Sequence, residues 1–177
     1  MAANLMPFSF LLKKLPRRQV LEALLPRYPK LEVSAVDCYM ALLELAGDIL
    51  TVTDMQLARH KTSLGRIRVL MQLLRCPGQA LAPGELAGRI GVTPATITGL
   101  LDGLEREGLV RRERCSGDRR SVLARLTPRG GRFLDRVMPE RFRVISRLMA
   151  RLSEADRRTL SRLLDAVSQG LKESARA

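Results

Sequence analysis

The sequence is poor in the residues on which most enzymes and metal sites depend. It has no tryptophan, only 3% aromatic residues, and a single histidine, His60. One histidine cannot build a histidine metal cluster or most proton relays. No phosphate-cradling glycine loop, HExxH or GxSxG pattern occurs. We therefore expect no enzyme, catalytic residue, metal or cofactor, and few aromatics for stacking on single-stranded bases.

Cysteines and long apolar runs are also scarce. Cys38, Cys76 and Cys115 are widely spaced and form no CxxC pair, so reduced thiols are expected in place of a zinc site or a disulfide framework. No stretch approaches the roughly 20 apolar residues of a membrane span. An apolar run at 5–12 contains a proline and is followed, not preceded, by lysines, unlike a secretory signal. We expect a cytoplasmic protein with no membrane partner.

What the chain has in excess is positive charge. Its 177 residues include 31 lysines and arginines against 18 acidic residues, a formal net charge of +13, with a pI near 11.0. This imbalance favours a polyanionic partner, with duplex nucleic acid ahead of a membrane surface. The length fits one domain, or a subunit that completes its core in an oligomer.

Two short helices are predicted between residues 83 and 107. Pro83 suits a first helical position, and Gly91 can end that helix in a left-handed conformation. Thr93 can cap a second helix that Pro94 opens. Apolar residues then recur at helical spacing and predict its buried stripe: Ile97, Leu100, Leu101 and Leu104.

The rest of the second helix is small and hydroxyl-rich at its N-terminal end. Such side chains let a helix approach a major groove closely. The candidate DNA contacts on this helix are Thr93, Pro94, Ala95, Thr96, Thr98, Gly99 and Arg106. On the two helices alone, an ordinary amphipathic hairpin explains the pattern equally well.

A basic hairpin follows directly and favours the DNA-binding interpretation. Residues 109–114 and 121–126 read as short strands around a polar turn containing glycine and aspartate. Its cations suit phosphates or a narrow minor groove: Arg111, Arg112, Arg114, Arg119, Arg120 and Arg125. A winged helix can serve protein binding instead, but such a wing would not need this charge.

At these residues the chain resembles the MarR family, the multiple-antibiotic-resistance type of bacterial regulator. The resemblance covers roughly residues 34 to 172. It is carried by three stretches: GVTPATIT at 91–98, LEREGLV at 104–110 and DRRSVLARLT at 118–127. In the last of these, the family pattern implies that Asp118 braces Arg120, and that Arg120 enters the minor groove. Gly99 departs from the pattern, because many members carry a longer polar or basic residue there.

The resemblance also implies repression relieved by a small aromatic or phenolic ligand. Polar groups for such a ligand could come from Tyr39, His60, Arg66 and Arg68, although each taken singly could equally be structural. A second branch of the family senses peroxides through a cysteine in its first long helix, where Cys38 lies. The alternative for Cys38 is a thiol buried in the core.

Long helices are predicted on both sides of the winged segment. Ser34 with Asp37 resembles a capping box and starts a helix that reaches about His60. That helix is apolar around most of its girth, so a second subunit is its natural cover. Another helix spans 64–75, with inward residues Ile67, Leu70, Met71 and Leu74. Helices are also expected after Pro128, kinked by a proline at 139, and after a second capping pair, Ser153 and Asp156.

Together these elements predict a mainly α fold: a winged helix-turn-helix with a small β-hairpin wing and a helical dimerisation layer. The winged domain would span 63–127, and the dimerisation region 34–62 and 128–177. Residues 1–33 form a basic arm, either a flexible extension or a short helix at 17–25 docked on a partner subunit. The expected partners are a second copy of the chain, an inverted-repeat duplex DNA site and a small-molecule effector.

Overall fold

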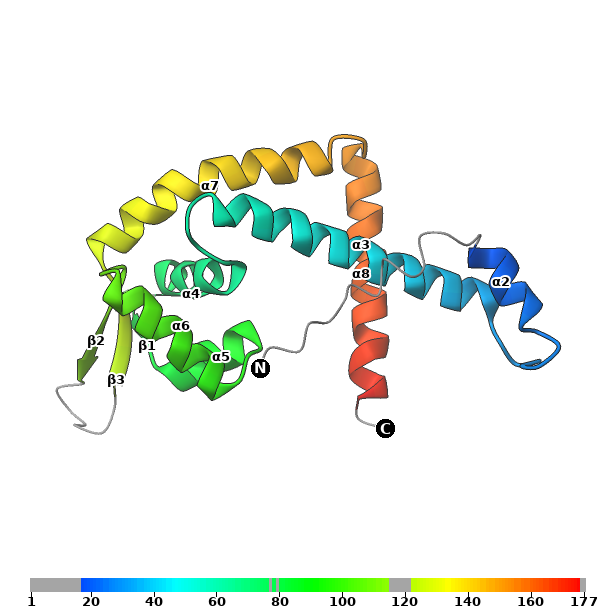
Figure 1. Ribbon diagram of the computed structural model, residues 1–177, viewed down its shortest axis with the longest axis horizontal. Helices are drawn as coiled ribbons and strands as arrows, with labels where there is room; N and C mark the ends of the chain where they lie inside the picture. Colours follow the sequence, from blue (N-terminus) through cyan, green and yellow to red (C-terminus); the bar gives the residue numbers. More distant parts are fainter. Residues whose placement is uncertain (1–16, 77, 79, 115–121, 176–177) are drawn as a thin grey trace. The chain divides into compact units, whose positions relative to one another are not determined.

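A computed structural model describes residues 17–76, 78, 80–114 and 122–175 (Figure 1). The chain divides into two compact units, Met1–Arg66 and Ile67–Ala177. The fold is mainly α, as the sequence predicts, and the predicted hairpin is part of a small three-stranded antiparallel sheet. None of the helices in the described ranges is long and apolar enough to cross a membrane.

The first unit contains α2 (Arg17–Ala23) and α3 (Val33–Ala58). The short helix expected in the basic arm is therefore present. The predicted capping box at Ser34 is wrong, because the N-cap of α3 is Glu32, two residues earlier, and the Glu32 side chain makes no capping hydrogen bond. The backbone N–H of Val36 already bonds the Glu32 carbonyl at 3.1 Å, which places Ser34 inside the first turn.

Most of α3 is open in the single chain. Its buried residues are confined to the C-terminal part: Thr53, Gln56 and Leu57. Large apolar side chains elsewhere along the helix are exposed: Leu43, Leu45, Ile49, Leu50, Val52 and Met55. The sequence of α3 is apolar on most sides of the helix, but one chain alone buries only a small part of that surface.

The winged part of the second unit consists of short elements in the expected order. Helix α4 (Leu64–Arg75) is followed by β1 (Ala80–Leu81), α5 (Pro83–Ile90), α6 (Pro94–Arg106), β2 (Val110–Arg114) and β3 (Val122–Leu126). Helices α7 (Pro128–Leu148) and α8 (Glu154–Ser174) complete the chain. Helix α7 continues through Pro139.

The local start and stop signals in the sequence determine the ends of α5 and α6. Gly91 and Gly108 both adopt left-handed φ angles, 66° and 68°. After each helix a backbone N–H reaches back five residues, from Val92 to Ala87 and from Leu109 to Leu104, as in a Schellman motif. The Thr93 hydroxyl caps α6 by accepting the Thr96 N–H at 3.2 Å.

The core of this unit lies between α4, α5, α6, the sheet and the start of α7. Its fully buried large side chains include Leu70, Leu73, Leu86, Ile90, Ile97, Leu101, Leu104, Leu134 and Val137. The predicted inward face of α4 is partly wrong. Leu74 is 41% exposed, whereas Val69 and Leu73 are buried, so the packed face is displaced around the helix.

The sheet has the strand order β1-β3-β2. Strands β2 and β3 pair from Val110↔Leu126 to Arg114↔Val122 and form the predicted hairpin. Strand β1 pairs with β3 through Ala80↔Arg125 and Leu81↔Ala124. The sequence did not indicate β1, because two residues are too few to show a strand periodicity.

Helix α7 meets the end of α6 and the sheet at a very close contact. The Thr127 hydroxyl donates to the Gly108 carbonyl at 2.8 Å and accepts the Gly130 N–H at 3.0 Å. A Cβ on Gly130 would overlap the carbonyl oxygen of Leu109 and lie 2.7 Å from Leu126 Cδ1. Only glycine fits here without displacing the backbone.

We expect Gly130→Ala to destabilise the protein, by about 1–3 kcal/mol as for other overpacking substitutions. Gly131→Ala is the matched control, because a Cβ there meets nothing within 4 Å and alanine favours a helix by up to about 1 kcal/mol. Urea unfolding of both variants measures the difference. Equal stabilities would contradict the close contact.

Candidate nucleic-acid interface

Helix α6 is divided into a buried stripe and an exposed face. Ile97, Leu101 and Leu104 are buried, with Leu100 half-buried. Six of the candidate DNA contacts are exposed together around its N-terminal half: Thr93, Pro94, Ala95, Thr96, Thr98 and Gly99. Arg106 is exposed at its C-terminal end. The structure thus gathers the helical candidates on one accessible surface.

The hydroxyl groups on this surface already make local hydrogen bonds. Thr98 donates to the Pro94 carbonyl at 2.9 Å, and the hydroxyls of Thr93 and Thr96 lie 2.9 Å apart. These bonds fix the side chains in one orientation, and each oxygen keeps further acceptor capacity. A Cβ on Gly99 would meet nothing within 4 Å, so the surface is flat and open at that position.

Arg112 connects the wing to α6. Its Nη1 atom lies 2.6 Å from Asp102 Oδ1 and 2.9 Å from Glu105 Oε2. The backbone N–H of Arg112 also donates to Glu105 Oε1 at 2.9 Å. The hydrogen bond to Asp102, together with the charges of both carboxylates, raises the pKa of Arg112. This candidate DNA contact is therefore a brace between β2 and α6.

A second ion-pair cluster lies across the two wing strands. Glu113 is 2.6 Å from Arg111 Nη2 and 2.7 Å from Arg125 Nε. The hydrogen bond from Arg125, reinforced by the charge of Arg111, lowers the pKa of Glu113. Arg125 also donates to the Gly78 carbonyl in the turn before β1. Two of the wing cations thus share one carboxylate.

The tip of the wing lies outside the described residues. Asp118, Arg119 and Arg120, the most specific part of the predicted DNA-binding set, belong to that segment. Arg114 ends β2, and its backbone pairs with Val122. Because Arg114 and Val122 are paired, the two strand ends that the tip connects lie at the same end of the hairpin.

Within the first unit, Tyr39 lies far from His60, and the fourth candidate ligand residue, Arg68, belongs to the second unit. Tyr39 is exposed near the start of α3, while His60 follows the end of that helix. The intervening helix is about 30 Å long at 1.5 Å per residue. Arg66 donates to the Lys61 carbonyl at 3.3 Å, and Arg68 is exposed on α4.

A groove of about 340 Å³ lies between α4 and α7. Its lining is almost entirely apolar: Met71, Leu74, Leu134, Asp135, Met138, Pro139 and Phe142. The sequence did not indicate this groove, because Leu74 was assigned to the core. Its exposure leaves the groove open.

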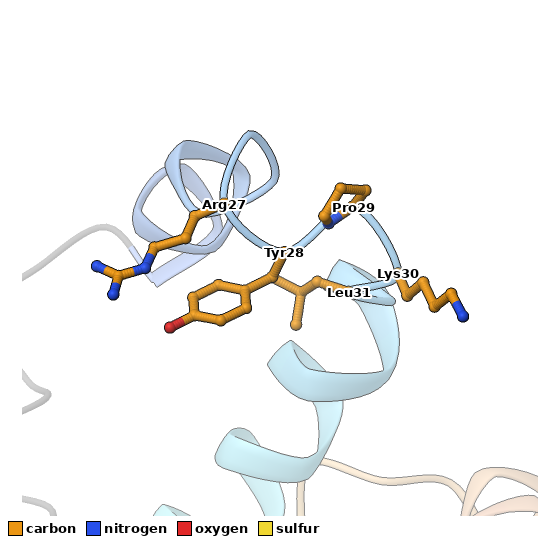
Figure 2. Close-up of a pocket in the computed structure, with 5 residues that line it drawn as sticks. All are labelled: Arg27, Tyr28, Pro29, Lys30 and Leu31. Carbon is orange, nitrogen blue, oxygen red and sulfur yellow. The ribbon is translucent and has the colours of Figure 1, made fainter.

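A further hollow is formed by five consecutive residues, Arg27 to Leu31, after α2 (Figure 2). The Arg27 guanidinium lies 5.7 Å from the centre of the Tyr28 ring. Because the hollow comes from one bend of the chain, it brings no distant residues together. Within the described ranges, no group of three His, Cys, Asp or Glu side chains could hold a metal ion.

The two consecutive helices, the capped exposed face of α6 and the hairpin braced against it define a winged helix-turn-helix protein. Comparison with known proteins identifies the family within this class. The MarR family model matches residues 63–122. The HTH-type transcriptional repressor YetL of Bacillus subtilis (strain 168) is 31% identical over 153 residues, covering 86% of this chain and 92% of that repressor. The chain belongs to the MarR family of DNA-binding transcriptional regulators.

Two solved structures are also similar. The first is Sco3205, a MarR family regulator from Streptomyces coelicolor solved in complex with DNA: TM-score 0.74, 26% identity, 80% of this chain and 89% of that chain. The second is the PcaV regulator from the same organism, solved with its natural ligand: TM-score 0.62, 25% identity, 71% of this chain and 90% of that chain.

We expect Arg112 and Glu105 to be energetically coupled. Arg112→Gln, Glu105→Gln and the double variant form a cycle whose coupling should be about 0.5–1 kcal/mol by urea unfolding, since the pair is partly buried and the carboxylate also holds a backbone N–H. The exposed pair Arg158 and Glu154 is the control, with at most about 0.5 kcal/mol. A coupling no larger than that of the control would show that the brace contributes nothing special.

Proposed function

We propose that the protein is a homodimeric repressor. It binds an inverted-repeat site in duplex DNA through α6 and the β2–β3 wing and releases the DNA when it binds a small aromatic or phenolic ligand. The observation that carries the proposal is the exposed face of α6. Small side chains from Pro94 to Gly99 leave it free to enter a major groove.

The geometry around α6 supports sequence-specific binding. The Arg112 brace holds the wing against the recognition helix, so both elements would meet a duplex in a fixed relation. Arg112 is paired with Asp102 and Glu105, while Arg111 and Arg125 share Glu113. We therefore assign the contacts to DNA to Arg106 on α6 and, from the sequence alone, to Arg119 and Arg120.

Exposed apolar surface on α3 and α8 supports a dimer. Helix α8 has no buried residue, and one of its faces carries Leu164, Val167 and Leu171, the last 71% exposed. Exposed apolar patches of this kind are typical of protein interfaces. A second chain that covers these helices would bury them and give the protein two recognition helices.

The apolar groove between α4 and α7 supports a small-molecule effector. An aromatic ring would contact Met71, Leu134 and Phe142 there, and Asp135 is its one charged lining residue. The similarity to PcaV, which was solved with its ligand, agrees with such a role. In this proposal the groove takes the apolar part of the effector, and Arg68 of α4 remains a candidate for binding its acidic group.

We predict that the protein retains genomic fragments that share an inverted repeat, with half-sites about 10 bp apart centre to centre and two chains per duplex. Sequencing of the retained DNA, followed by binding assays, tests this. Arg120→Ala should weaken DNA binding strongly while leaving the fold and the dimer intact, because the family pattern puts this arginine into the minor groove from the tip of the wing. Thr98→Ala should instead change the preferred bases.

The matched control for Thr98→Ala is Thr51→Ala in α3. Thr51 donates to the Gly47 carbonyl at 2.9 Å, so it has the same bond to the preceding turn but lies outside the recognition helix. Thr51→Ala should leave both affinity and sequence preference unchanged. Full operator affinity in Arg120→Ala would show that the wing assignment is wrong.

We predict that an aromatic carboxylate, and not oxidation of Cys38, releases the DNA. The thiol is exposed in the single chain, contrary to the buried position expected from the sequence, so access alone does not decide between the two mechanisms. Gel-shift titrations of wild type and Cys38→Ser should show release by the carboxylate in both. Peroxide-driven release that disappears in Cys38→Ser would establish the thiol mechanism instead.

A further inference from the structure

Five arginines lie along one face of α7, and we call them the α7 arginine stripe: Arg129, Arg132, Arg136, Arg143 and Arg147. Their spacings of three, four, seven and four residues keep them within an arc of about 60° at 3.6 residues per turn. All five are exposed. Glu140 is the one acidic residue on the same face, which therefore stays strongly positive.

The stripe is not neutralised by its surroundings. Within the described part of the chain, none of the five arginines is ion-paired with a carboxylate, unlike Arg112 and Arg125 in the wing. Arg136 lies over the Phe133 ring at 5.5 Å, which leaves its guanidinium edge free to bind. The surface thus offers a row of accessible donors.

We propose that the α7 arginine stripe is a second nucleic-acid surface, one that binds a phosphodiester backbone without regard to base sequence. From Arg129 to Arg147 it extends about 27 Å, a length of duplex axis that carries roughly 16 phosphates, at one per 1.7 Å with both strands counted. Guanidinium groups bind phosphate oxygens in pairs of hydrogen bonds. A row of them therefore suits a surface as dense in phosphates as a nucleic-acid backbone.

Two other kinds of partner, a membrane surface and a folded protein, fit this face less well. A membrane-bound helix inserts its apolar side, but in the first half of α7 that side is buried in the core at Leu134 and Val137. The exposed apolar residues of its second half, Phe142, Ile145 and Leu148, lie outside the arc of the stripe at 100° per residue. A protein interface normally has an apolar centre within a polar rim, and the stripe has no apolar residue along its midline. A charged backbone without pockets is the partner that this surface matches.

The stripe is separate from the surface that we assign to operator recognition. Helix α7 joins the sheet at Thr127 and Gly130. Arg143 and Arg147 follow that junction by about 20 Å or more along the helix. The inference goes beyond the proposed function, because it requires neither an operator nor an effector.

The test uses the full-length triple variant Arg136→Gln, Arg143→Gln and Arg147→Gln, with glutamine chosen because it is a good helix former. The control removes the same charge from exposed positions on or just before α8, away from the face of Leu164, Val167 and Leu171: Arg151→Gln, Arg158→Gln and Arg162→Gln. Two random-sequence duplexes serve as probes, a short one of about two helical turns and a long one of about six. Affinity is measured by fluorescence anisotropy over a range of salt concentrations, after circular dichroism shows unchanged folding.

For the stripe variant, we expect the slope of log affinity against log salt to become shallower by about 2 to 3, since each lost phosphate contact removes about 0.9. The α8 control should keep the wild-type slope. A change seen only with the long duplex assigns the stripe to DNA beyond the segment that α6 and the wing contact. A second bound equivalent of the short duplex, lost in the variant, assigns it to another DNA segment.

Three results would overturn the proposal. The stripe variant could keep the wild-type slope, or both triple variants could lose the same amount, which would show an effect of net charge alone. The third is loss of binding to phosphatidylglycerol vesicles with DNA binding unchanged, which would make the surface a membrane contact. Because random DNA is the probe, these results do not depend on whether an inverted-repeat operator exists.

Discussion

The contact between the first turn of α7 and the segment after α6 is the constraint on which the winged unit depends. Thr127 and Gly130 together join the end of the recognition helix, the last strand and the long helix at one point. The Thr127 hydroxyl bonds both neighbouring elements, and the missing side chain at Gly130 lets the two backbones touch. Any shift of α7 along its axis would therefore be transmitted directly to α6 and the wing.

Charge has two different uses in this unit. In the wing, arginines are paired with Asp102, Glu105 and Glu113. The first two pairs hold β2 against α6, and the third joins β3 to β2. The arginines of the α7 arginine stripe face solvent without such partners among the residues that the structure describes. The wing arginines and the stripe arginines contribute equally to the net charge. Neighbouring carboxylates give the wing arginines a structural role, whereas the stripe arginines remain available to bind a ligand.

The sequence predicted the helix ends of the winged unit well, because those signals are local. Pro83, Gly91, Thr93 and Gly108 act through their own backbone preferences and nearest neighbours. The errors arose where distant residues decide. The ion pairs of Arg112 depend on the packing of β2 against α6, strand β1 exists only through its pairing with β3, and the exposure of Leu74 depends on how α4 packs.

The open space beside Gly99 also bears on how such a regulator can change its target. Because a side chain at this position would meet no protein atom, it could be enlarged without disturbing the core, the cap or the wing brace. Most positions of a packed helix lack this freedom, since substitution there has a cost in stability. A new base preference could therefore arise by a single codon change, and related regulators in one genome could diverge in specificity while keeping the same scaffold.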